Sequence, residues 1–88
     1  MKAKSGFVLR NIMGEQMLMP TDENIATFKG TVLLNETAAL LWEKLQTPSS
    51  REDLLNAILD EYEVDEATAS ADLDVVLKKF KELDIITE

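Results

Sequence analysis

Residues 28–46 read FKGTVLLNETAALLWEKLQ, and the hydrophobic pattern changes its period within this stretch. The apolar run that ends at Leu34 is too short for a helix, so it predicts a strand over about 28–34. Asn35 is a favourable helix N-cap, and the apolar residues after it recur at helical spacing. These features predict a helix over about 35–46 and divide the chain into a strand-forming part and a helical part.

The part before this stretch predicts two further short strands, over about 6–10 and 15–19. Turn-forming residues from Asn11 to Gly14 separate them. Pro20 and the polar residues after it end the second strand, because proline cannot donate a hydrogen bond to a sheet.

The part after this stretch predicts two more helices, over about 50–61 and 65–83. Ser50 with Asp53 resembles a capping box, and Asp65 is a favourable N-cap. Ile85 and Ile86 then fit either a final extended segment or an apolar tail on the core. Strands followed by helices with short connections indicate a single α+β domain over residues 1–88, in which a three-stranded antiparallel sheet is followed by three helices.

Composition argues against an enzyme. The 88 residues contain no histidine and no cysteine, which removes the commonest general base and the thiolate nucleophile. The glycines are isolated and form no phosphate-binding loop. Carboxylates are abundant on the second helix, but their spacing matches no calcium loop. We therefore expect no catalytic residues, no metal site and no cofactor.

Charge is unevenly distributed along the chain. The net charge is −8, and residues 36–88 carry five cations and fourteen anions. This acidic part is either an ordinary solvated surface or a feature that favours a basic partner. It fits nucleic acid poorly, since phosphate binding needs clustered Lys and Arg. The longest apolar stretch, Ala38 to Trp42, is far too short to span a membrane, so we expect a soluble, cytoplasmic protein.

Two features point to a binding surface. The predicted third strand is apolar on both faces, with Val32 and Leu34 on one and Leu33 on the other. It is either buried on both faces or leaves an open edge that can accept a partner strand. On the third helix, Val75 lies outside the core-facing stripe. It is either a boundary residue or, with Ala71, the floor of a groove in which Asp72 and Lys79 bind polar groups of a peptide.

A series of segments along nearly the whole chain resembles one known family. The segments, in order, are Phe7-Val8-Leu9-Arg10, Gly14, Pro20, Phe28-Lys29-Gly30, Leu34-Asn35-Glu36-Thr37-Ala38, Leu41-Trp42-Glu43, Glu61-Tyr62-Glu63-Val64-Asp65, and then Asp72, Phe80, Leu83 and Ile85-Ile86. In this order and spacing they are similar to the PqqD family, and more to its broad branch than to the members dedicated to pyrroloquinoline quinone. The chain departs from the family pattern at Gln46-Thr47-Pro48 and at Asp84, where family members often have glycine.

The resemblance implies a winged helix-turn-helix-like fold and a non-catalytic role as a peptide chaperone, or recognition element, for ribosomally made peptides. Such a domain binds the leader segment of a precursor peptide as an added strand. It presents the peptide to a modifying enzyme, often of the radical SAM class. Carried over by position, the peptide-binding residues are Thr31, Val32 and Leu33 on the strand and Thr68, Ala71, Asp72 and Val75 on the helix.

Two other functions remain open at this stage. An acidic adaptor would dock on a protein without a peptide substrate. A winged-helix transcriptional regulator would need a basic recognition helix, whereas Lys78, Lys79 and Lys81 lie only at the end of an otherwise acidic helix. An open strand edge also allows self-pairing, so we expect a monomer or a weak homodimer.

Overall fold

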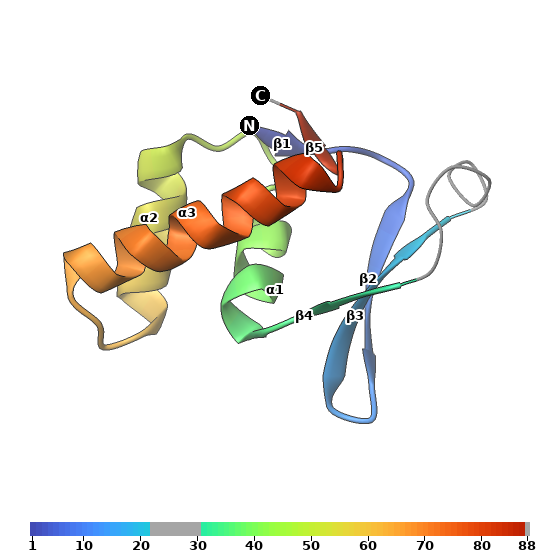
Figure 1. The fold of residues 1–88 in the computed structure, drawn as a ribbon, viewed down its shortest axis with the longest axis horizontal. Helices are drawn as coiled ribbons and strands as arrows, with labels where there is room; N and C mark the ends of the chain where they lie inside the picture. The colour runs from blue at the N-terminus through green and yellow to red at the C-terminus, as the bar shows by residue number, and fades with distance from the viewer. Residues whose placement is uncertain (22–30, 88) are drawn as a thin grey trace.

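The chain forms a small sheet followed by helices, and the computed structural model describes residues 1–21 and 31–87. The sheet has three antiparallel strands in the order β2-β3-β4 (Figure 1). With the three helices after it, the sheet confirms the predicted α+β class. Residues 28–30 of the predicted third strand lie outside the described residues, and β4 starts at Val32. The strands are β2 (Phe7–Ile12), β3 (Glu15–Pro20) and β4 (Val32–Leu34).

The β2–β3 hairpin turns over two residues, Met13 and Gly14, between the paired residues Ile12 and Glu15. Both turn residues have positive φ, 54° and 84°, as a type I′ turn requires. The Oδ1 of Asn11 accepts a hydrogen bond from the N–H of Gly14 at 3.1 Å. The sequence predicted that Asn11 leaves the strand. Instead its backbone stays paired while its side chain stabilises the turn, so β2 extends beyond its predicted end.

Each helix begins directly after the residue that the sequence predicted as its N-cap. The Oδ1 of Asn35 accepts a hydrogen bond from the N–H of Ala38 at 2.8 Å. Ser50 and Asp53 form a reciprocal capping box. The Oδ1 of Asp65 accepts a hydrogen bond from a backbone N–H of the first turn at 2.9 Å. The helices are α1 (Glu36–Lys44), α2 (Arg51–Glu61) and α3 (Glu66–Glu82).

Trp42 joins the sheet to the helices at the centre of the core. Its ring is 2% exposed and meets Phe7 of β2 and Phe80 of α3 edge to face, at centroid distances of 6.2 and 5.8 Å. The apolar stripes expected on the helices supply most of the other core residues. The largest fully buried side chains are Leu18, Leu41, Leu45, Leu54, Ile58, Leu73, Phe80 and Ile85.

The C-terminus of α3 ends in a Schellman motif. The N–H of Ile85 donates to the carbonyl of Phe80 at 3.2 Å, and the N–H of Asp84 donates to that of Lys81 at 3.1 Å. Asp84 adopts the left-handed conformation, with φ of 58°, that such a turn needs. This is the position at which the sequence departs from a glycine pattern. The turn directs Ile85 into the core, where it is fully buried.

A two-stranded ribbon that the sequence did not predict joins the chain ends. β1 (Lys2–Ala3) pairs antiparallel with β5 (Ile86–Thr87), and the two ends lie side by side (Figure 1). The sequence left open whether Ile85 and Ile86 form an extended segment or an apolar tail on the core. Ile85 is a core residue, and Ile86 lies in the strand β5. A strand of two residues is too short to show a periodic pattern, so periodicity alone does not predict the pairing of the two ends.

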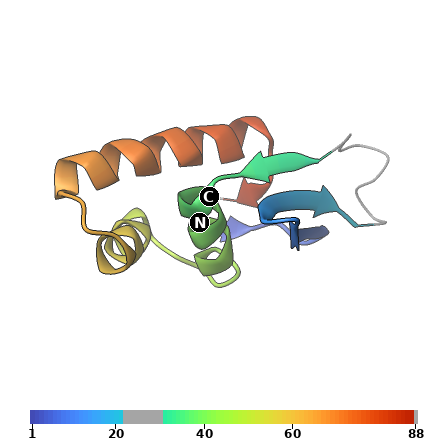
Figure 2. The same cartoon turned by 90° about the horizontal axis from the view of Figure 1, so that it is seen from below.

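β4 is the strand that lies next to α3. Figure 2 shows β4, in green, between α3 and the rest of the sheet. Among residues 1–21 and 31–87, β4 is thus the edge strand of the sheet on the side of α3. Among the helices that the structure describes, none is long and apolar enough to cross a membrane.

Candidate functional site

A groove of about 650 Å³ lies where β4 enters α1 and faces α3. Its walls come from four parts of the fold: the β2–β3 hairpin, β4, the start of α1 and the second half of α3. Below, "the groove" means the cleft lined by Gly14, Glu15, Gln16, Leu33, Leu34, Asn35, Glu36, Ala38, Val75, Val76, Lys79 and Phe80.

The β4 wall of the groove is an open sheet edge. β4 pairs with β3 on one side, and no strand among residues 1–21 and 31–87 pairs with its other side. The side chains of β4 alternate, so that Leu34 is 6% exposed in the core while Leu33 is 55% exposed at the groove. An apolar side chain beside unpaired backbone groups is the arrangement that accepts an added strand.

The α3 wall of the groove combines buried and exposed apolar residues. Phe80 and Val76 face the core and form the base, while Val75 is 69% exposed at the rim. Val75 is the most exposed large apolar residue of the helices that the structure describes. Val75 and Leu33 thus give the groove an exposed apolar surface that does not belong to the hydrophobic core.

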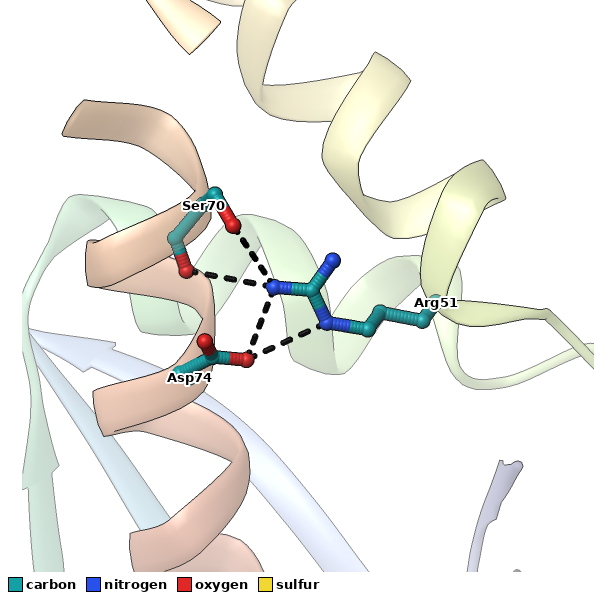
Figure 3. Close-up of polar contacts among 3 residues, drawn as sticks. All are labelled: Arg51, Ser70 and Asp74. Atoms are coloured by element: carbon teal, nitrogen blue, oxygen red, sulfur yellow. Dashed lines mark hydrogen bonds and ion pairs between the residues drawn. The ribbon is translucent and has the colours of Figure 1, made fainter. Parts of the chain in front are cut away.

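A polar clamp on another side of α3 ties this helix to α2. The guanidinium of Arg51 donates to Oδ1 of Asp74 from Nε at 3.1 Å and from Nη2 at 2.8 Å, and its Nη2 also donates to the Ser70 hydroxyl at 2.7 Å (Figure 3). The two charged side chains are 44% and 64% exposed, so the pair contributes about 1 kcal/mol or less to stability. It joins the start of α2 to the middle of α3, one residue before Val75.

The groove contains two of the seven residues expected to bind peptide, Leu33 and Val75. Thr31 and Val32 lie beside it on the chain that forms its edge. Ala71 and Asp72 are exposed on the first half of α3, outside the groove lining.

Thr68 also lies outside the groove lining, where it takes part in the N-terminal cap of α3. Its N–H donates to Asp65, and hydrogen bonds from its side chain and N–H hold the pKa of Asp65 below the ordinary value. This gives Thr68 a structural role at its position.

Sequence reasoning did not single out several groove residues. Glu15 and Gln16 come from the hairpin, and their place at the groove depends on Gln16 pairing with Leu34 across the sheet. Asn35 and Glu36 were interpreted only as helix-starting residues. Their position directly after the open strand was the one signal that could have revealed them.

The groove also contains charged side chains. Its charged residues are Glu15, Glu36 and Lys79, and all three are exposed. Within the part of the chain that the structure describes, no three His, Cys, Asp or Glu side chains are placed to hold a metal ion. Among the carboxyls of the described residues, those with a lowered pKa are Asp53 and Asp65, which belong to helix caps outside the groove.

Comparison with known proteins gives one family and two similar structures. The sequence model of the family described as "Coenzyme PQQ synthesis protein D (PqqD)" matches residues 15–86. A solved structure described as "TbiB1 in Complex with the TbiA(beta) Leader Peptide" is 24% identical, with a TM-score of 0.73 over 97% of this chain and 93% of that chain. Another, described as "Lasso peptide synthetase B1 complexed with the leader peptide", is 21% identical, with a TM-score of 0.73 over 99% of this chain and 96% of that chain. No curated protein matches the sequence significantly.

Proposed function

The chain belongs to the PqqD family, and from that premise we propose that it binds the leader segment of a ribosomally made precursor peptide and presents it to a modifying enzyme. The observation that carries the proposal is the open edge of β4 beside an apolar groove against α3. The two similar structures support it, because each is described as a complex with a leader peptide.

The proposed binding mode is strand addition. The leader extends the sheet beside Thr31, Val32 and Leu33, and its backbone pairs with the free groups of β4. One of its apolar side chains enters the groove between Leu33 and Val75. Hydrogen bonds from the backbone give affinity for any extended peptide, while the groove gives selectivity for particular side chains.

The proposed site extends along α3 beyond the groove. From Val75 back to Thr68 the helix rises about 10 Å, which about three residues of extended peptide cover. A leader that leaves the groove toward the first half of α3 would therefore pass over Ala71 and Asp72. Thr68 would mark the far end of this path.

The domain's part in modification is non-catalytic in this proposal. It holds the leader, and the partner enzyme supplies the chemistry on the rest of the peptide. Radical SAM enzymes are one class of partner that fits. Because the precursor is made by ribosomes, the domain would act in the cytoplasm.

A backbone amide NMR titration with leader peptides encoded beside this chain tests the proposal. We expect shifts concentrated at residues 31–36 and 68–80, with slowed amide exchange in β4. Shifts confined to the exposed face of α2, with none at β4, would contradict strand addition. Such a result, together with binding to a neighbouring enzyme, would instead identify an acidic adaptor.

A further inference from the structure

Two carboxylates, those of Glu15 and Glu36, line the groove near the end of β4. Gln16 pairs with Leu34, so Glu15 lies level with Asn35, one residue before Glu36. Both glutamates line the groove and are exposed. Leu33 precedes this point along β4, and Val75 lies on the α3 wall of the groove. The groove is thus apolar beside Leu33 and acidic where β4 enters α1.

These carboxylates are available to a ligand. In the described part of the chain the ion pairs are Lys4–Asp84 and Arg51–Asp74, and neither includes a groove residue. Lys79 lies on the opposite wall, one helical turn beyond Val75. With two glutamates and this lysine, the groove carries a net charge of one negative unit. The acidic residues 36–88 add a field of the same sign.

We propose, on the basis of the proposed function, that the groove selects leader segments in which a large apolar residue lies two positions from a lysine or arginine. The apolar side chain occupies the space between Leu33 and Val75. Alternate residues of an extended strand point to the same face about 6.8 Å apart, so the second side chain reaches the acidic end of the groove. There its cation binds the carboxylates of Glu15 and Glu36.

The size of this preference follows from exposure. Exposed ion pairs contribute little individually, and two of them acting on one cation should change the affinity by about three- to tenfold. The effect should weaken between low salt and physiological salt, where the screening length falls to about 8 Å. The apolar anchor and the backbone pairing remain the larger part of the binding energy.

The test is selection from a display library of random twelve-residue peptides on immobilised protein. The wild-type chain, the Glu15→Gln/Glu36→Gln variant and a Glu61→Gln/Glu63→Gln control would each be used. Both double variants change the net charge equally, but Glu61 and Glu63 lie outside the groove lining. Far-UV circular dichroism would show that each variant is folded.

We expect wild-type selection to enrich lysine or arginine two positions from a large apolar residue. The groove variant should bind these peptides about three- to tenfold more weakly, whereas the control should retain their affinity. Enrichment without a basic residue would overturn the inference but not the proposed function. An equal loss in the control would also overturn it, by showing that only the overall charge matters.

Failure of the proposed function itself would look different. Selected peptides that bind a Val75→Asp variant as tightly as the wild type would not occupy the groove. That outcome would overturn leader binding at this site, and the charge preference with it.

Discussion

Leu33 of β4 and Val75 of α3 are 55% and 69% exposed, and both face the same groove. One comes from a sheet edge and the other from a helix tied to α2 by the Arg51 clamp. When a ligand removes apolar side chains of this size from water, the binding free energy becomes more favourable by about 25 cal/mol per Å² of apolar surface buried. We therefore expect the affinity for a bound peptide to be most sensitive to substitution of Leu33 and Val75.

Val75→Asp should reduce leader affinity about tenfold or more, because it places a carboxylate against the apolar anchor of the peptide. Stability should change by only about 0.5 kcal/mol, since Val75 is largely exposed. Fluorescence anisotropy with a labelled leader peptide and a thermal melt measure the two effects. The control is Val64→Asp, at an exposed valine outside the groove lining, which should leave affinity unchanged. Equal losses in both variants would count against the groove.

Met13→Asn should stabilise the domain by up to about 1 kcal/mol, because asparagine adopts the left-handed conformation at a lower cost. Met13 has φ of 54° in the type I′ turn, a conformation in which asparagine is favoured. Its side chain is 98% exposed, so the substitution removes no packing. Urea denaturation measures the gain. Met13→Ala tests the cause, because alanine keeps the unfavourable conformation and should bring no gain.

Asp84→Val should destabilise the domain by about 1–2 kcal/mol, because a β-branched residue tolerates φ of 58° poorly. Asp84→Gly removes the steric cost of the left-handed conformation. It also removes the ion pair with Lys4, whose Nζ lies 2.7 Å from Oδ1 of Asp84. These effects oppose each other, so the glycine variant should remain close to the wild type. Lys4→Gln removes the ion pair alone and should lose about 1 kcal/mol or less. A glycine variant as unstable as the valine variant would contradict this account.

Stability should fall in acid as two helix caps become protonated. Hydrogen bonds from the backbone and side chain of Ser50 hold the pKa of Asp53 below its ordinary value of 3.8, and hydrogen bonds from the side chain and backbone of Thr68 do the same for Asp65. A pKa lowered by folding means that the stabilisation is complete above about pH 3.8 and is lost as the pH falls through the lower, folded values. Melting temperatures of the wild type and of Asp53→Asn/Asp65→Asn, measured across this range, should converge toward the acid end. The control for lost charge alone is Asp60→Asn, at a carboxylate that caps no helix.

The order of elements could be predicted because it depends on local signals. Asn35, Ser50 and Asp65 mark helix starts by the hydrogen bonds that their own side chains accept, which needs no knowledge of distant residues. Val75 was visible for a similar reason, since helical periodicity alone separates it from the core stripe. Local chemistry therefore revealed one wall of the groove.

The rest of the site depends on long-range pairing, which a single sequence does not encode in readable form. Glu15 reaches the groove only because Gln16 is paired with Leu34. A shift of that register by one residue would move its side chain to the other face of the sheet. The end of β2 was mispredicted for a local reason. Asn11 is a turn-forming residue, but it remains paired in the strand and accepts the hydrogen bond of the turn from there.

The β1–β5 ribbon has a topological consequence. It pairs Lys2 with Thr87. In Figure 1 the ribbon of β1 and β5 lies at the top of the view, whereas β4 enters α1 lower down. Adjacent ends are the geometric condition for circular permutation and for insertion into a host loop. A larger polypeptide could therefore carry this domain through a single attachment point, with the groove away from the host.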